Sequence, residues 1–358
     1  MTLIKKIVLS TGGTGGHIFP AIAISEYLTS KNIYNKITTD KRGYRFIKNY
    51  DLSCEIINSK SFINKNPIIL LVNFCLTILA FIKSFIFLIK EKPDLVIGFG
   101  GYASVPVCLV ASIFKIKLVI YENNLIVGKA NKFLANFSNI ILSANEDVQN
   151  LNSKNNNKII VTGNIVRKQF LKKNFNLNTQ TDKNFNILIL GGSQSAKVFG
   201  EKLPKLLIKL FKNGVNISIS QQCTSEQQQL IKSEYSSFGV SNHVFTFSNN
   251  INEHFEKANL VITRSGASII GEILNSRVPF ICIPLPKSAD NHQMINAKFY
   301  EKKGCCLLVN EQDIDNYLSN TITKIKNDKK LVEKMIKAQS QILEQTSFKN
   351  FENLIKNL

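Results

Sequence analysis

The 358-residue sequence lacks several patterns that would assign it to common functional classes. No Cys-x-x-Cys pair occurs among its seven cysteines, which argues against a zinc ribbon, and their odd number fits reduced thiols. No Gly-Lys-Ser/Thr follows a glycine turn, and the dinucleotide pattern G-x-G-x-x-G fails because position 18 is Ile. The apolar run after Lys5 and Lys6 is too short for a signal peptide. These absences weaken the P-loop, oxidoreductase and zinc-ribbon interpretations.

Arginine is scarce, because only five of the 45 basic residues are arginine, although the net charge is +20. Such a charge allows phosphates, nucleic acid or an anionic membrane as partners. The abundance of Lys, Asn and Ile also fits a simple bias in composition. Since no basic-aromatic motif or recognition module is present, we expect no nucleic-acid partner. Two of the arginines, Arg167 and Arg264, lie in motif-like segments where a planar guanidinium is of use.

What the sequence does contain is a unit of apolar strand, glycine turn and helix, and it occurs four times. The units are "KIVLSTGGTGGHIFPAIAISEYLTS", "PDLVIGFGGYASVPVCLVASIF", "FNILILGGSQSAKVFGEKLPKLLIKLF" and "NLVITRSGASIIGEILNS". Apolar strands that alternate with helices predict parallel sheets covered on both faces. A polar, Asn-rich stretch at Lys172–Phe185 separates the first two units from the last two. We therefore predict an α/β protein of two doubly wound, Rossmann-like domains, with the binding site in a cleft between them.

The segment Pro67–Lys90 is apolar and long enough to span a bilayer by the ~20-residue criterion. A span would place two strand-turn units of one sheet on opposite sides of the membrane, and Lys83 falls inside the run. Two alternatives remain: a helix buried in the core, or a helix partly exposed for membrane docking. Lys83, Lys90 and Lys92 are available for anionic lipid, so we predict docking without a span.

The glycine turns can each hold a phosphate, because helix N-termini attract anions and glycine permits close approach. His17 directly follows the first turn, where an imidazole suits proton transfer near neutral pH. Glu122 and Asn124 lie in "YENN", at the end of an apolar strand, and point to the ligand crevice of a parallel sheet. Downstream, Glu272 could accept the two hydroxyls of a ribose. Packing, turn and capping roles remain the plainer alternative for each of these residues.

In order and spacing, the motifs resemble those of the MurG family. The motifs are "GGTGGH", "GFGGYAS", "GNIVR", "GGSQS", "TRSGA…GE" and "HQMINA". The resemblance implies a glycosyltransferase-B architecture and an inverting, metal-independent transfer of N-acetylglucosamine without a cofactor. The donor would be UDP-N-acetylglucosamine and the acceptor undecaprenyl-pyrophosphoryl-N-acetylmuramoyl-pentapeptide, so that lipid I becomes lipid II in peptidoglycan synthesis. The enzyme would be peripheral, on the cytoplasmic side of the cell inner membrane.

The resemblance also implies domains and site residues. Residues 1–165 would form the acceptor and membrane-associating domain, residues 166–341 the donor domain, and a helix at about 342–358 would pack back on the first. His17 would be the general base, with Glu122 as a second candidate. The implied substrate-binding residues are Thr14, Gly15, Gly16, Tyr102, Asn124, Arg167, Ser193, Ser248, Ile251, Ala267, Ser268, Ile269, Ile270, Gly271, Glu272 and Gln293.

Two positions depart from the family pattern. "YENN" stands where the family has H-E-Q-N, so Tyr121 cannot perform the acid–base work of a histidine. Ser195 stands where the family usually has glycine. Three alternatives stay open: a transferase of this fold with another lipid acceptor, a UDP-sugar epimerase, or a homologue that has lost activity.

Overall fold

The computed structural model describes residues 4–13, 15–59, 66–171, 184–342 and 347–358, and at positions 67, 70 and 193–196 the backbone alone. The chain divides into two compact units: unit 1 is Met1–Lys168 with Glu344–Leu358, and unit 2 is Gln169–Leu343. Thr14 and most of the predicted linker, Lys172–Phe185, lie outside the described residues.

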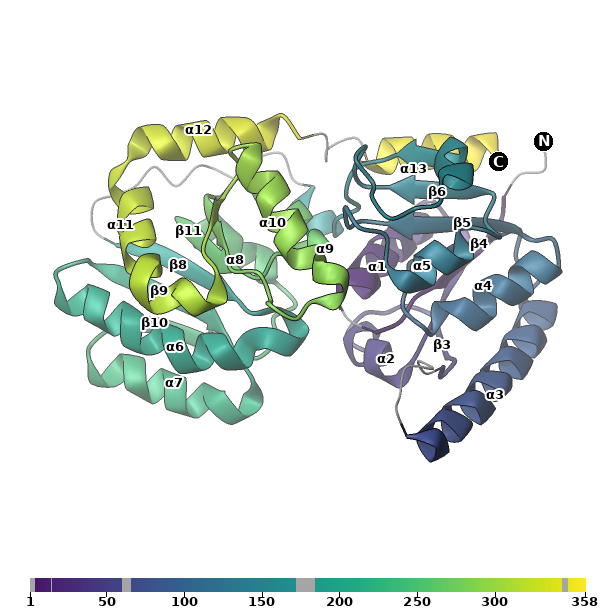
Figure 1. Cartoon of the computed structure of the whole chain (residues 1–358), viewed down its shortest axis with the longest axis horizontal. Helices are drawn as coiled ribbons and strands as arrows, with labels where there is room; N and C mark the ends of the chain where they lie inside the picture. Colours follow the sequence, from purple (N-terminus) through teal and green to yellow (C-terminus); the bar gives the residue numbers. More distant parts are fainter. Residues whose placement is uncertain (1–3, 14, 60–65, 172–183, 343–346) are drawn as a thin grey trace. The chain divides into compact units, whose positions relative to one another are not determined.

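Unit 1 is built on a seven-stranded parallel sheet of order β3-β2-β1-β4-β5-β6-β7 (Figure 1). Its strands are β1 (Lys6–Ser10), β2 (Tyr34–Thr39), β3 (Cys54–Ile56), β4 (Leu95–Gly98), β5 (Lys117–Glu122), β6 (Ile140–Ser143) and β7 (Ile159–Val161). Its helices are α1 (Gly15–Ser30), α2 (Lys41–Ile47), α3 (Pro67–Glu91), α4 (Ser104–Ile113), α5 (Lys129–Leu134) and α13 (Ser347–Asn357).

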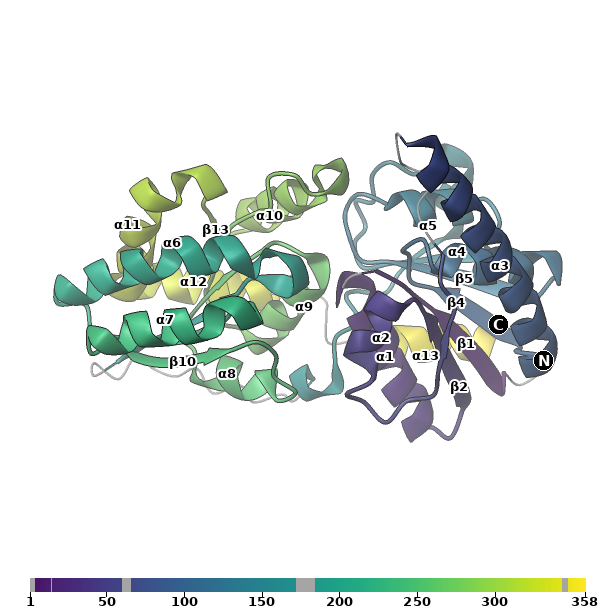
Figure 2. The same ribbon diagram turned by 90° about the horizontal axis from the view of Figure 1, so that it is seen from below.

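The apolar run of β1 is buried on both faces, as the sequence predicts for a parallel sheet. Ile7 and Leu9 join a core cluster with α1, α2 and α13, whereas Val8 joins a cluster with α3 and α4 on the other face. Figure 2 shows the helices on the two faces of the sheet. The strand order reverses between β1 and β4, so the loops after these two strands meet at the switch point, where α/β sheets bind ligands.

Unit 2 repeats this plan with a six-stranded parallel sheet of order β10-β9-β8-β11-β12-β13. Its strands are β8 (Phe185–Leu190), β9 (Ile217–Gln222), β10 (Ser241–Phe245), β11 (Leu260–Thr263), β12 (Phe280–Cys282) and β13 (Leu307–Leu308). Its helices are α6 (Gly192–Lys212), α7 (Ser225–Ser237), α8 (Ile251–Lys257), α9 (Ala267–Ser276), α10 (His292–Lys302), α11 (Ser319–Asn327) and α12 (Lys329–Ser340). The predicted class of two doubly wound parallel sheets is confirmed. The switch point of this sheet lies between β8 and β11.

Helix α3 buries its more polar face and exposes its more apolar one. Asn73, Thr77, Ala80 and Ser84 are buried on the inner face, which packs against α4. The exposed large apolar residues of the helix are Ile68, Ile69, Leu71, Val72, Phe74, Ile78, Leu79, Ile82, Phe85, Ile86 and Ile89. Leu71–Glu91 is long and apolar enough to cross a membrane, but only 33% of its most apolar window is buried. Of the two alternatives, full burial is therefore wrong for this helix.

Candidate functional site

The two glycine loops of unit 1 touch each other. A Cβ added to Gly101, which has φ +80°, would lie 2.5 Å from the backbone oxygen of Gly12. A Cβ added to Gly12 would lie 2.6 Å from Cβ of Ala103. Neither contact is possible with a larger residue, so the loops after β1 and β4 can be this close only as glycines. Tyr102, a predicted site residue, lies half-buried in the second of these loops.

Helix α1 begins in the first glycine loop with Gly15 and Gly16. Pro20 has no N–H and therefore cannot bond to the carbonyl of Gly16, four residues earlier in the helix. Asn123 Nδ2 donates to this Gly16 oxygen at 3.1 Å. The "YENN" segment is thereby attached to the start of α1.

His17 lies in the first turn of α1, against bare backbone. A Cβ added to Gly100 would lie 3.0 Å from His17 Cε1 and 3.1 Å from His17 Nδ1. The same point lies 3.2 Å from Nδ2 of Asn131 in α5. Gly100 has φ +96°, and with no side chain it leaves the space that the imidazole occupies.

Glu122, at the end of β5, is only 1% exposed, and its carboxylate accepts four hydrogen bonds. Oε1 accepts from the backbone N–H and from Nδ2 of Asn124, both at 3.0 Å. Oε2 accepts from the N–H of Gly128 and from Asn131 Nδ2, both at 3.0 Å. Two lone-pair sites on each oxygen are thus used within the protein. A general base must offer an oxygen to the reacting hydroxyl, so this geometry argues against Glu122 as the base.

Tyr121, at the position where the family pattern has histidine, packs in the core and links two segments of unit 1. Its ring is 2% exposed and packs 5.7 Å from the ring of Phe99, centre to centre. Its hydroxyl oxygen accepts a hydrogen bond of 2.9 Å from the N–H of Ile165. Tyr121 therefore connects "YENN" with the "GNIVR" loop that carries Arg167.

Arg167 is buried next to the first glycine loop. Its guanidinium carbon lies 4.4 Å from the ring centre of Phe19, a cation–π contact. The same ring lies over Gly15, because a Cβ there would be 2.8 Å from Phe19 Cε2. Burial raises the pKa of nearby Glu26, while the positive charges of Arg167 and Lys168 oppose this shift. The arginine of the predicted "GNIVR" motif is thus brought beside the first glycine motif.

In unit 2, Arg264 lies in the loop after β11 and contacts three other segments of the unit. Its guanidinium donates to the carbonyls of Ile283 and Pro284 at 3.1 and 3.2 Å, pairs with Glu311, and lies over the ring of Phe199 at 4.6 Å. Burial lowers the pKa of Arg264, and Glu311 acts in the opposite direction. Only the planar guanidinium makes all these contacts at once, which explains an arginine in a lysine-rich chain.

The predicted donor-binding residues lie on neighbouring elements of unit 2. The stretch from Ala267 to Glu272, which includes Ser268, Ile269, Ile270 and Gly271, forms the first part of α9. Helix α8, which begins at Ile251 just after Ser248, packs against α9. Ser193 lies in the first turn of α6, after β8, and its side chain is outside the described part of the chain. Glu272 is 3% exposed.

Gln293 is fixed between two of the loops that follow strands of this sheet. Its Oε1 accepts from the N–H of Leu285 at 3.0 Å, in the loop after β12. Its backbone oxygen accepts from Ser265 Oγ at 2.8 Å, in the loop after β11. Asn296 Nδ2 donates to the Ser265 carbonyl at 3.1 Å. With Oε1 engaged by Leu285, the amide N–H donors are the groups of this side chain that remain for other partners.

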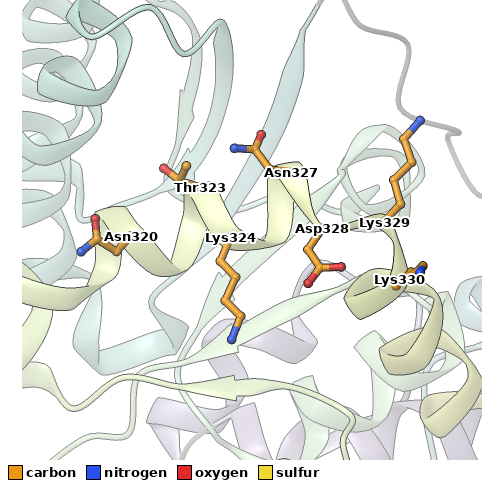
Figure 3. Close-up of a pocket in the computed structure, with 7 residues that line it drawn as sticks. All are labelled: Asn320, Thr323, Lys324, Asn327, Asp328, Lys329 and Lys330. Carbon is orange, nitrogen blue, oxygen red and sulfur yellow. The ribbon is translucent and has the colours of Figure 1, made fainter.

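A surface hollow of about 640 Å³ lies elsewhere, at the corner between α11 and α12 (Figure 3). Its lining residues are Asn320, Thr323, Lys324, Asn327, Asp328, Lys329 and Lys330. None of the residues predicted from sequence lines it. Within the described ranges, no three His, Cys, Asp or Glu side chains gather to hold a metal ion.

Sequence reasoning missed Asn131 and Gly100, which contact the predicted residues. Asn131 is 1% exposed, and its Nδ2 donates to the carbonyl of Tyr121 and to Glu122, each at 3.0 Å. The signal available in the sequence was an asparagine nine residues after Glu122, close to the start of a helix. That spacing gains a meaning only once α5 is seen to fold back on the end of β5.

Comparison with known proteins assigns the chain to a family. Residues 7–143 match the Glycosyltransferase family 28 N-terminal domain, and residues 186–355 match the Glycosyltransferase family 28 C-terminal domain. A protein of Pelagibacter ubique (strain HTCC1062) is 37% identical over 312 residues, 87% of this chain and 86% of its own. It is named UDP-N-acetylglucosamine--N-acetylmuramyl-(pentapeptide) pyrophosphoryl-undecaprenol N-acetylglucosamine transferase. The Rickettsia bellii (strain RML369-C) protein of the same name is 36% identical over 360 residues and covers 98% of this chain and 95% of its own.

Among solved structures, that of Acinetobacter baumannii MurG has a TM-score of 0.74, with 24% identity over 99% of this chain and 100% of its own. At this identity the likeness shows the fold, which is the predicted glycosyltransferase-B fold, whereas the relatives above carry the family assignment. The chain belongs to glycosyltransferase family 28 and, within it, to the MurG family.

Proposed function

We propose that this protein transfers N-acetylglucosamine from UDP-N-acetylglucosamine to the C4 hydroxyl of undecaprenyl-pyrophosphoryl-N-acetylmuramoyl-pentapeptide. The observation that carries the proposal is the shared name of relatives that align over nearly the whole chain at 36 and 37% identity. The contact between the glycine loops of unit 1 supports it, because the resemblance assigns both loops to the acceptor and the reacting sugars.

In the proposed reaction, the acceptor oxygen attacks the anomeric carbon, the bond from that carbon to the UDP oxygen breaks, and configuration inverts. His17 takes the hydroxyl proton as general base. Negative charge grows on the departing pyrophosphate, where helix N-termini and Arg167 would stabilise it. Thr14, Gly15 and Gly16 would approach the pyrophosphates, and Tyr102 and Asn124 the sugars.

Unit 2 would hold the donor. Glu272 would accept the ribose hydroxyls, and Gln293 would donate its amide hydrogens to the sugar. The remaining proposed contacts to the nucleotide and phosphates are Ser193, Ser248, Ile251, Ala267, Ser268, Ile269, Ile270 and Gly271. Ser248 precedes α8, and the others lie on α6, α8 and α9; this placement at the carboxyl ends of parallel strands supports the assignment.

Turnover with purified protein tests the proposal. Radiolabelled UDP-N-acetylglucosamine and a short-chain analogue of the muramoyl-pentapeptide lipid should give one labelled lipid disaccharide and UDP. An analogue with hydrogen in place of the C4 hydroxyl should give none. Transfer to a diacylglycerol instead, or epimerisation of the donor without transfer, would contradict the proposal. His17→Ala should lower kcat by about 10²–10⁴-fold and leave donor binding intact.

We also propose that the protein docks through α3 on the cytoplasmic face of the inner membrane. The described residues on the exposed face of this helix are almost all apolar, and Ile113, 71% exposed, ends α4, the helix that packs against α3. Lys83, Lys90 and Lys92 are exposed along the same helix and at its end, where they suit anionic headgroups. A monomeric surface rarely exposes so large an apolar patch without a partner.

Co-sedimentation with phosphatidylglycerol vesicles tests this docking. Replacing Ile82 and Ile86 together by Gln should weaken binding by about 10-fold or more, because each apolar side chain contributes roughly 1.5–3 kcal/mol when buried. Leu230→Gln is the matched control, since Leu230 is 67% exposed on α7 in unit 2. Complete release by high salt alone would contradict the apolar contribution. Protease access to the chain from both sides of the bilayer would instead indicate a span.

A further inference from the structure

The carboxylate of Glu122 accepts hydrogen bonds from two segments, one on each oxygen. Oε1 holds Asn124 within "YENN", while Oε2 holds Gly128 and Asn131 at the start of α5. A carboxylate is the one side chain of this size that accepts at both ends. Glu122 therefore fixes where the Asn131 amide lies and which of its atoms face which neighbour.

The Asn131 amide and the His17 ring both face the bare backbone of Gly100. The point where a Gly100 Cβ would lie is 3.2 Å from Asn131 Nδ2, and 3.0 and 3.1 Å from Cε1 and Nδ1 of His17. Asn131 Nδ2 is engaged by Tyr121 O and Glu122 Oε2. Its Oδ1 is buried and has no hydrogen-bond partner in the described part of the chain. This buried oxygen is the acceptor that the amide still offers, and a ring that gains a proton gains an N–H to donate.

We propose that Glu122 and Asn131 are positioning residues that act through His17. Glu122 holds the Asn131 amide in one orientation, and Asn131 Oδ1 accepts a hydrogen bond from Nδ1–H of His17 as the ring becomes charged. Nε2 of His17 is then the atom that takes the proton of the acceptor hydroxyl. A base oriented by a third group is a recurring arrangement in transfer enzymes, and such hydrogen bonds tighten only when substrate is bound. This inference rests on the proposed function for its catalytic part.

The alternative is that Glu122 itself is the base. The two assignments differ in what a nearly isosteric change does. In Glu122→Gln, an NH₂ group replaces one oxygen and faces N–H donors of either Asn124 or the Gly128–Asn131 pair. With the NH₂ group toward Gly128 and Asn131, the Asn131 amide keeps only its hydrogen bond to the Tyr121 carbonyl, so its orientation and the support of the imidazole are weakened while His17 itself is intact.

The experiment combines kinetics with magnetic resonance of the isotope-labelled histidines, of which the chain has four. His17 is identified by the signal that disappears in His17→Gln. For Glu122→Gln and for Asn131→Ala we expect a fall in kcat of about 10- to 100-fold, a donor KM within about twofold of wild type, and a changed His17 ring signal. The double variant should be no slower than the slower single variant, because both changes act on one ring.

Glu55→Gln is the matched control, since Glu55 is a 46% exposed carboxylate of the same unit, and it should leave the His17 signal and kcat unchanged. If Glu122→Gln does not fold, Asn131→Ala carries the test. In the wild type, magnetisation transfer between the Asn131 amide and the His17 ring should also be seen. An unchanged His17 signal in folded Glu122→Gln, or kcat losses that multiply in the double variant, would overturn the proposal. The His17 magnetic-resonance signals can be measured without turnover. If the wild-type protein had no transferase activity, the proposed function would be refuted, while the effect of Glu122 and Asn131 on the His17 ring would still be tested.

Discussion

At the residue scale, Pro20 and Asn123 form a compensating pair. Proline removes an N–H from which the Gly16 carbonyl would otherwise accept a hydrogen bond. Asn123 is 4% exposed and donates to this oxygen at 3.1 Å. The irregular start of α1, which carries His17, is thus stabilised from the "YENN" segment rather than by the helix itself.

Asn123→Ala should therefore destabilise unit 1 by about 0.5–1.5 kcal/mol, since it removes the hydrogen bond from Asn123 to the Gly16 carbonyl. Urea unfolding measures the loss. The additional change Pro20→Ala restores an N–H at the right position and should recover part of the stability, although Pro20→Ala alone gains little. If the double variant is no more stable than Asn123→Ala, the pairing of these two residues is wrong.

The polar residues that end the parallel strands could be predicted individually, and the contacts among them could not. The local pattern predicts that "YENN" lies at the edge of the sheet, because an apolar strand directly precedes it. The bond from Tyr121 to Ile165 joins residues 44 positions apart, and Glu122 meets Asn131 only after α5 folds back. Burial and partner choice depend on tertiary packing, so the sequence left Glu122 as a possible base.

At the element scale, the C-terminal end of α3 is held to the sheet by a buried ionic cluster. Glu91, 7% exposed, accepts from Lys6 of β1 at 2.8 Å and from Lys36 of β2 at 3.2 Å, and Tyr34 donates to it at 3.2 Å. Glu91, the last residue of α3, directly follows the apolar run and attaches this end of the helix to β1 and β2. Length and hydropathy are visible in the sequence, but which face is buried is decided by contact with α4.

Glu91 should make the stability of unit 1 depend on pH. Burial alone would raise its pKa, but hydrogen bonds from Lys6 and Lys36 outweigh this and lower it below the ordinary value. The folded protein then binds fewer protons than the unfolded chain, so the contribution is complete above the ordinary carboxyl pKa and is lost as pH falls through the folded one. Glu91→Gln should cost about 1–3 kcal/mol at neutral pH and make the acid side of the stability profile flatter.

Urea unfolding of both proteins between pH 7 and pH 3 measures this difference, since the ordinary carboxyl pKa is about 4.3. Glu55→Gln again serves as control, because Glu55 also lies near Lys36, at 3.7 Å, but is 46% exposed. It should change stability by less than about 1 kcal/mol at any pH. A gap between wild type and Glu91→Gln that stays constant down to the lowest pH would argue against the assigned role of the charge.

At the scale of the whole molecule, the chain builds unit 1, then unit 2, and returns to unit 1 with α13. Phe351 of this last helix is fully buried in the core that includes β1 and α1. Tyr27 of α1 donates to Glu352 at 2.6 Å, and hydrogen bonds from Lys356 and Tyr27 lower the pKa of Glu352 to about 2. The family resemblance predicts that this helix packs back on the first domain, which local pattern alone cannot show because Tyr27 and Glu352 lie more than 300 positions apart.

Phe351→Ala should therefore loosen the N-terminal part of the chain and not the part adjacent in sequence. Removing a buried phenylalanine costs about 3–5 kcal/mol, so amides of β1 and α1 should exchange hydrogen faster, while those of β8 and β11 keep their wild-type rates. Phe255→Ala is the mirror control, because Phe255 is equally buried in unit 2, and it should give the opposite pattern. Faster exchange in both units with either substitution would mean that the two units unfold together. In that case α13 would not stabilise unit 1 alone.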